Sequence, residues 1–121
     1  MFTISKKFSL ECAHSIEGHP GECKRLHGHT YRIRLTFQGE MLDPLGMLVD
    51  FGVIKRLITE KYDHKDLNIC LENVNPTAEN FAKVIWEEIT AYCCTLPNKP
   101  RCIAVEVWET PTSKAVYTPE D

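Results

Sequence analysis

Three histidines in this sequence stand at positions where they could share one metal ion. His27 and His29 open an alternating apolar pattern, and His14 closes an earlier pattern of the same kind. Residues two apart in a strand point to the same face of a sheet. If the two strands pair, three imidazoles meet at the rim of one apolar face. Three neutral nitrogen ligands with a fourth position left open are typical of a catalytic zinc site.

The alternative is that these histidines are ordinary polar residues at strand ends. A single histidine in such a place is more often half-buried and unliganded. Two at alternate positions, with a third on the matching parity of another strand, are harder to explain by chance, so the pattern favours metal binding. His19, in the loop between the two patterns, is interpreted as a solvent-exposed histidine, although it is close enough in sequence to compete as a ligand.

A cysteine and an Asp-His pair could carry proton chemistry. Cys23 lies in a polar segment beside Lys24 and Arg25, and both nearby positive charge and a metal favour the thiolate. Asp63 precedes His64, and a carboxylate near an imidazole fixes its tautomer and raises its basicity. A charge-rich surface loop has the same composition, and on sequence alone that simpler interpretation of the pair is favoured.

Glu109 is the one acidic residue that continues an apolar strand pattern. It follows Ile103, Val105 and Val107 on their parity, at the end of the strand. A buried carboxylate without a partner costs several kcal/mol. The side chain therefore either reaches solvent or accepts two hydrogen bonds from a flat ring rich in N–H groups. The pattern leaves both alternatives open.

These residues must be positioned by a small set of strands and helices. Residues 2–14 and 27–38 alternate like strands, and residues 15–26 between them form a loop. The period becomes helical after Asp50, a plausible N-cap, and again after Thr77; residues 63–68 between the two helices are interpreted as a loop. A third strand follows from Ile103, and residues 114–118 can form a short fourth.

The order β–β–α–α–β–β predicts an α+β domain: an antiparallel four-stranded sheet with two helices on one face. The other face is polar, since it carries Arg32, Arg34 and Glu106. Open sheet edges are liabilities that association removes. We therefore expect an oligomer whose sheets join edge to edge.

Size and composition indicate one globular domain spanning residues 1–121. A formal net charge of −3 argues against general nucleic-acid binding. A local phosphate-binding patch of Lys24, Arg25, Arg32 and Arg34 stays open, although a solvated strand face is the more common meaning of such residues. The sequence has no apolar run of membrane-spanning length and no export signal, so we expect a cytoplasmic protein whose six cysteines are reduced.

The motifs together resemble the 6-pyruvoyl-tetrahydropterin synthase family, specifically its bacterial 6-carboxy-tetrahydropterin synthase branch. A bare His-Gly-His is weak, but the ordered set is highly specific and runs through nearly the whole chain. It comprises Phe8…His14, Cys23-x-x-x-His27-Gly28-His29, Asp50-Phe51, Asp63-His64-x-x-Leu67-Asn68, Asn75-Pro76-Thr77-Ala78-Glu79-Asn80 and Glu109-Thr110. Tyr62 departs from the pattern, which has leucine before the Asp-His pair.

The resemblance implies a tunnelling fold (T-fold), in which three subunits close their sheets into a barrel and two trimers stack into a homohexamer. Arg32 and Arg34 would line the tunnel, and sites would lie between subunits. The implied roles are Zn2+ ligands for His14, His27 and His29, base for Cys23, proton relay for Asp63 and His64, and pterin binding for Glu109 with Thr77 nearby.

The implied activity is a lyase reaction of 7,8-dihydroneopterin triphosphate. It yields 6-carboxy-5,6,7,8-tetrahydropterin, acetaldehyde and triphosphate, on the way to queuosine and related 7-deazapurines. One alternative is 6-pyruvoyl-tetrahydropterin synthase, which eliminates triphosphate in biopterin synthesis. A variant that makes a hydroxymethyl-pterin is disfavoured, because Cys23 is retained at the expected spacing. An alternative of another class is a non-catalytic zinc-binding oligomerisation module, which a closed fourth position, filled by His19 or Cys23, would favour.

Overall fold

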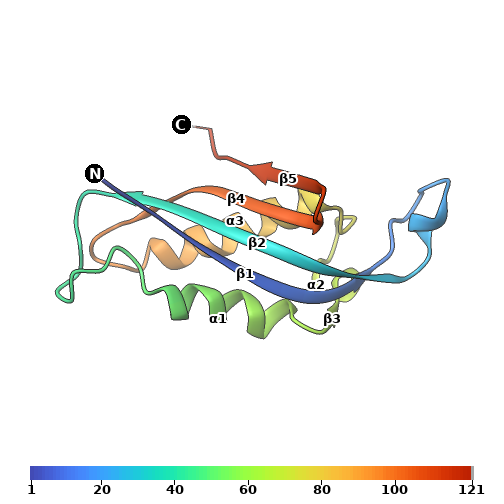
Figure 1. Cartoon of the computed structure of the whole chain (residues 1–121), viewed down its shortest axis with the longest axis horizontal. Helices are drawn as coiled ribbons and strands as arrows, with labels where there is room; N and C mark the ends of the chain where they lie inside the picture. The colour runs from blue at the N-terminus through green and yellow to red at the C-terminus, as the bar shows by residue number, and fades with distance from the viewer. Residues whose placement is uncertain (121) are drawn as a thin grey trace.

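Two long antiparallel strands form the centre of the molecule (Figure 1). The computed structural model describes residues 1–120. Strands β1 (Phe2–His14) and β2 (His27–Gly39) pair along their whole lengths, and β4 (Arg101–Thr110) and β5 (Ser113–Tyr117) extend the sheet beyond β2. The predicted antiparallel sheet is confirmed.

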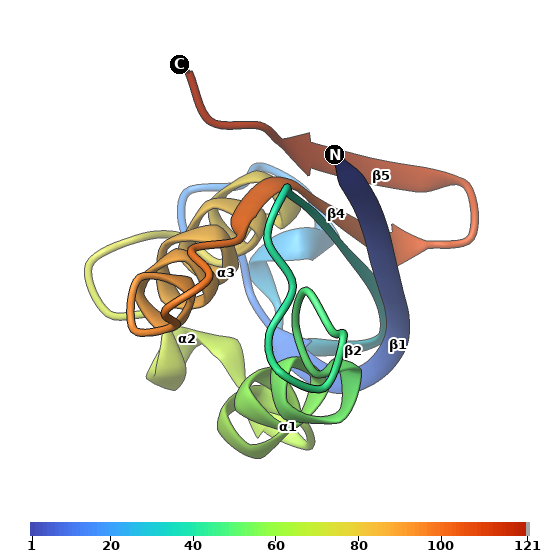
Figure 2. The ribbon, with the colours of Figure 1, turned by 90° about the vertical axis from the view of Figure 1, so that its left-hand side faces the viewer.

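Two helices cover one face of this sheet. Helices α1 (Phe51–Tyr62) and α3 (Ala78–Cys93) lie on the same side of it (Figure 2). The predicted N-caps begin both helices: Asp50 accepts hydrogen bonds from the amides of Gly52 and Val53, and Thr77 accepts one from the amide of Asn80. No helix within residues 1–120 has the length and apolar character needed to cross a membrane.

The core lies between the helices and the alternate residues of the strands. Every second residue of β2 is fully buried, beginning just after the two histidines, and residues of both helices meet them. Each such aliphatic or aromatic side chain contributes about 1.5–3 kcal/mol when it leaves water. The buried residues include Tyr31, Ile33, Leu35 and Phe37 from β2, Ile54 and Ile58 from α1, and Phe81, Ile85 and Ile89 from α3.

The segment predicted as a loop at residues 63–68 is partly regular. Strand β3 (Lys65–Asp66) pairs in parallel with the end of β1, and the short helix α2 (Leu67–Cys70) follows. The amide of Glu11 donates to Asp63 Oδ1 at 2.8 Å, and the amide of His64 donates to the carbonyl of Glu11 at 2.6 Å. The sheet therefore has a fifth strand, too short to produce an alternating pattern in the sequence.

The connection between β1 and β2 projects beyond the end of the sheet (Figure 1). It is a loop, as predicted, that contains one 3₁₀ turn, η1 (Glu22–Lys24), with the half-buried Cys23 at its centre. The side-chain amides of Asn68 and Asn75 each form two hydrogen bonds with the backbone of this loop, Asn68 with Ser15 and Asn75 with Glu17. These bonds fix the base of the loop beside the helical layer.

Both edges of the sheet are open over most of their length. On one side β3 pairs only with Cys12 and Ala13, so the earlier residues of β1 have no strand beside them on their outer edge within residues 1–120. On the other side β5 is the last strand. Unpaired N–H and C=O groups of this kind favour pairing with another chain.

Candidate metal centre

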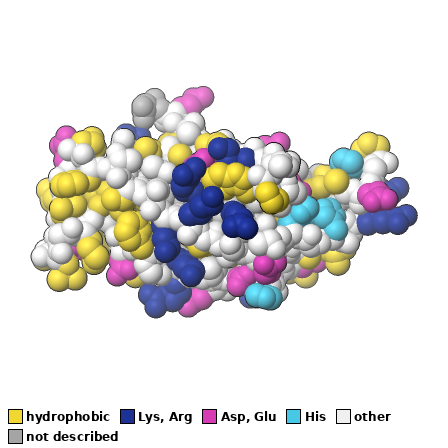
Figure 3. All heavy atoms as spheres, viewed as in Figure 1, with side chains coloured by type: hydrophobic (Ala, Val, Ile, Leu, Met, Phe, Trp, Pro, Cys, Tyr) yellow, Lys and Arg dark blue, Asp and Glu magenta, His cyan; other side chains and the backbone are white. Residues whose placement is uncertain are grey.

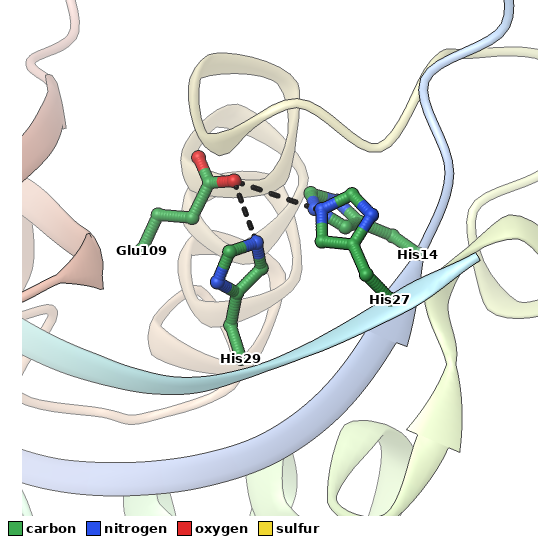
Figure 4. A group of neighbouring side chains, drawn as sticks. All are labelled: His14, His27, His29 and Glu109. Carbon is green, nitrogen blue, oxygen red and sulfur yellow. Dashed lines mark hydrogen bonds and ion pairs between the residues drawn. The ribbon is translucent and has the colours of Figure 1, made fainter. Parts of the chain in front are cut away.

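The sheet register brings the three predicted histidines together (Figure 4). His14 lies directly opposite His27, and Cys12 lies opposite His29, so all three rings extend from one end of the same face. The ring centroids form a nearly equilateral triangle with sides of 4.6, 4.8 and 5.0 Å. The pairing of two strands thus brings three imidazoles together.

Backbone carbonyls fix the tautomers of two of these rings. His14 Nδ1 lies 2.7 Å from the carbonyl oxygen of Pro76, and His27 Nδ1 lies 2.7 Å from that of Arg25. A carbonyl can only accept, so each Nδ1 carries the proton and each neutral ring has its lone pair on Nε2. A carbonyl partner of this kind is the usual support of a metal-binding histidine.

The two Nε2 atoms then face each other at 3.1 Å. Two lone pairs at this distance repel, unless a cation lies between them or one ring takes up a second proton. The nitrogens of a tetrahedral zinc site are separated by about 3.3 Å, given Zn–N bonds of about 2.0–2.1 Å. The observed spacing therefore fits a shared metal ion.

The third ring has no conventional hydrogen-bond partner. His29 Nε2 is buried and lies 2.9 Å from Glu109 Oε1, yet it makes no hydrogen bond of acceptable geometry with the described residues. Burial lowers the pKa of His29, and His14 and His27 act in the same direction, while Glu109 opposes them. The ring is thus held in the neutral form that binds metals.

Glu109 brings a fourth donor to this cluster. Its Oε1 lies 3.3 Å from His14 Nε2, and the ligand atoms of the four residues all lie within 4.8 Å of one another. Figure 4 shows the carboxylate pointing toward the rings from the end of β4. The carboxylate therefore lies beside the metal-binding nitrogens of the protein itself, within reach of an ion held by them.

The predicted proton-transfer residues lie outside the four-residue cluster. Asp63 Oδ2 is 3.2 Å from Nδ1 of the exposed His64, whose positive φ of 58° turns the backbone at the edge of the sheet. Cys23 lies in η1, where its carbonyl accepts a hydrogen bond from the amide of Ile16. No contact within residues 1–120 joins Cys23 to the Asp63–His64 pair.

The structure also identifies supporting residues that sequence reasoning missed. The buried hydroxyl of Tyr31 lies 3.1 Å from His14 Nδ1, and burial raises the pKa of Tyr31, so the phenol stays neutral. The carbonyls of Pro76 and Arg25 are the other two supports. Only Tyr31 left a signal in the sequence, as the residue two after His29 on the same parity.

Thr77 comes directly after Pro76, whose carbonyl supports His14. The hydroxyl of Thr77 caps α3 by accepting a hydrogen bond from the backbone amide of Asn80 at 3.1 Å. Replacing Thr77 by alanine should therefore lower the free energy of unfolding by about 1 kcal/mol, as loss of an N-cap usually does. Urea denaturation measures this, and Asp50→Ala, which removes the cap of α1, is the matched comparison. Unchanged stability would contradict the capping role.

Comparison with a solved structure places this fold in a class. A solved structure, the 6-pyruvoyl tetrahydropterin synthase of Caenorhabditis elegans, superimposes with a TM-score of 0.79 at 24% identity, covering 98% of this chain and 96% of that one. The fold is therefore the one that the sequence resemblance implied.

The sequence comparison defines the family. A family model described as 6-pyruvoyl tetrahydropterin synthase matches residues 3–120, and the chain belongs to that family. It is 42% identical to the 6-carboxy-5,6,7,8-tetrahydropterin synthase of Bacillus subtilis (strain 168), covering 98% of this chain and 86% of the relative. It is 37% identical to the protein of the same name from Synechocystis, covering 97% and 93%. The predicted family is confirmed.

Proposed function

We propose that this protein is a zinc-dependent 6-carboxy-5,6,7,8-tetrahydropterin synthase. It would convert 7,8-dihydroneopterin triphosphate to 6-carboxytetrahydropterin, acetaldehyde and triphosphate, for queuosine or another 7-deazapurine. The observation that carries the proposal is the set of three imidazoles, two of them with carbonyl-fixed tautomers, in a chain whose relatives bear that name.

His14, His27 and His29 would hold the zinc. When bound there, zinc would supply Lewis-acid chemistry: it would polarise the oxygens of the substrate side chain and acidify the adjacent C–H bond. Cys23 would remove that proton as a thiolate. Asp63 would orient His64 through their 3.2 Å contact, so that the imidazole passes protons to and from the reacting side chain.

The assembly would complete the site. Because Cys23 and the Asp63–His64 pair make no contact within the described residues of one chain, we propose that neighbouring subunits bring them together. The open edges formed by β1 and β5 would join three chains into a barrel, and two such trimers would form a cytoplasmic homohexamer. Light scattering after gel filtration measures the number of subunits.

Product analysis tests the proposed activity. Zinc-loaded protein is incubated with 7,8-dihydroneopterin triphosphate, and the products are identified by mass. Acetaldehyde together with the carboxylated pterin is the expected result. A 6-pyruvoyl product without acetaldehyde would indicate 6-pyruvoyl-tetrahydropterin synthase instead.

A second candidate function is a non-catalytic zinc-binding oligomerisation module. Glu109 favours it, because a fourth protein donor beside three histidines can close the coordination sphere, as in structural zinc sites. His19 and Cys23, the fourth donors considered from the sequence, are not in the cluster. Absence of any turnover by zinc-loaded hexamer would support this module.

Glu109→Gln separates the two functions of that carboxylate. If Glu109 anchors the pterin, the variant keeps its zinc and kcat/KM falls about 10- to 100-fold, because a hydrogen bond to a charged group contributes about 1.5–3 kcal/mol. Zinc analysis after dialysis and steady-state kinetics measure the two effects. Loss of zinc from this variant would instead make Glu109 a structural ligand.

A further inference from the structure

The face of the sheet opposite the helices carries a group of cations around Trp108. Figure 3 shows Lys and Arg side chains gathered over the middle of this face. In the sheet register Lys7 lies opposite Arg34, and in the next row Arg32 and Lys114 flank Trp108. We call these five residues the Trp108 cluster.

Three of the cations contact the indole ring directly. Lys7 Nζ lies 4.3 Å from the ring centroid of Trp108, Lys114 Nζ lies 5.0 Å from it, and Arg34 Cζ lies 5.3 Å from it. A cation over an indole ring is attracted by its negative face. Trp108 therefore attracts three positive groups to one place on this face of the chain.

One carboxylate partly neutralises this group. Glu106 accepts hydrogen bonds from Arg34 Nε at 2.6 Å and from Lys114 Nζ at 3.1 Å. Burial raises the pKa of Glu106, but its bonds and charge pairs with Arg34 and Lys114 outweigh that effect and lower it overall. Glu106 is thus ionised, and four cations face one anion.

This excess of positive charge is unfavourable for the fold alone. Like charges directly opposite each other on paired strands are destabilising, and Lys7 and Arg34 occupy such positions. Neither Lys7 nor Arg32 has a carboxylate partner among residues 1–120. Places where local chemistry conflicts with stability are commonly functional. An anion bound over the cluster would remove the conflict.

One groove is lined by a residue of the cluster and by a residue of the candidate metal centre. This groove of about 260 Å³ lies along β5, and both Glu109 and Lys114 line it. Lys114 therefore shares this groove with Glu109 and also belongs to the Trp108 cluster. The two groups of residues are thus neighbours on this part of the chain.

We propose that the Trp108 cluster binds an oligophosphate, namely the inorganic triphosphate that the reaction releases. The inference rests on the proposed function for the identity of the anion. Triphosphate offers several negative charges along one short chain, which matches cations spread over two rows of the sheet. The free N–H groups of Lys7 and Arg32 would be its main donors.

Calorimetric titration of the zinc-loaded protein with inorganic triphosphate tests this proposal. Wild-type protein is expected to bind it, and Lys7→Met should weaken binding about tenfold, because one charged donor is lost. Lys55→Met removes an equal charge from the exposed side of α1 and is the matched control, with unchanged affinity expected. Added salt should weaken wild-type binding through screening.

Three results would overturn the proposal. The first is no binding of triphosphate by the folded wild-type protein. The second is equal affinity of wild type and Lys7→Met, which would place the anion elsewhere, for example on the metal. The third is displacement of triphosphate by a short single-stranded oligonucleotide that binds more tightly, which would make the cluster a nucleic-acid site.

The titration does not depend on turnover. If the protein releases no acetaldehyde but binds triphosphate through Lys7, the proposed reaction is refuted and the anion site is supported. If the protein makes the carboxylated pterin but binds triphosphate equally well without Lys7, the reaction is supported and the anion site is refuted.

Discussion

His27→Ala is expected to release the bound zinc and abolish turnover. The Nε2 atom of His27 faces that of His14 at 3.1 Å. The carbonyl of Arg25 fixes the tautomer of the His27 ring, so that this Nε2 carries a lone pair. Loss of a supporting outer-shell partner alone costs about 10- to 100-fold in metal affinity. Loss of the ligand itself should cost more than about 100-fold, and metal analysis after dialysis measures it.

His27 is the informative ligand to remove because the fold does not depend on it. His14 is fully buried beside Tyr31, so its loss would disturb the core together with the metal. His27 is only partly buried at the beginning of β2. Circular dichroism of His27→Ala should therefore match that of wild type, which separates loss of zinc from loss of structure.

His19→Ala is the matched control. His19 is exposed in the loop between β1 and β2, and its Nδ1 accepts a hydrogen bond from the amide of Gly21. This variant should keep both zinc and activity. Undiminished zinc in His27→Ala, or release of zinc from His19→Ala, would refute the ligand set of His14, His27 and His29.

The long strands and their histidines were predictable because the pattern is local. Alternation places His27 and His29 on the parity of Tyr31 and Ile33, and any antiparallel pairing that buries this face brings His14 to the same end. The starts of α1 and α3 were likewise predictable, because Asp50 and Thr77 are good N-cap residues and an apolar helical period follows each of them. In these places the sequence and the structure agree because one face must be buried.

The contacts that complete the site were not predictable, because they join distant segments. Pro76 supports His14 through a backbone carbonyl, which leaves no signal in a side-chain pattern. Glu109 reaches the histidines only because β4 pairs beside β2, and the sequence pattern does not specify which strands are neighbours. Strand β3 consists of two residues that pair with the end of β1, and two residues are too few to show an alternating pattern.

The packing around Tyr62 illustrates a departure that the structure explains. This tyrosine stands where the sequence resemblance predicts leucine, and it is fully buried at the end of α1. Its hydroxyl donates to the carboxylate of Glu88 on α3, so the polar atom added to the core has a partner. The change alters helix packing and touches none of the candidate site residues.

Cys23→Ala is expected to keep zinc and the hexamer while kcat falls about 10²- to 10⁴-fold, the usual contribution of one general base. Cys23 is half-buried in η1 and belongs neither to the four-residue metal cluster nor to the core. Its side chain is therefore free to act on a substrate without supporting the fold. Steady-state kinetics, zinc content and light scattering measure the three properties separately.

Cys94→Ala is the control for Cys23, since Cys94 is also a free thiol but is exposed at the end of α3. It should retain full activity. Full activity of Cys23→Ala would remove this cysteine from the mechanism and leave the Asp63–His64 pair as the base. Loss of zinc together with activity would make Cys23 a metal ligand, which the position of Glu109 beside the three histidines argues against.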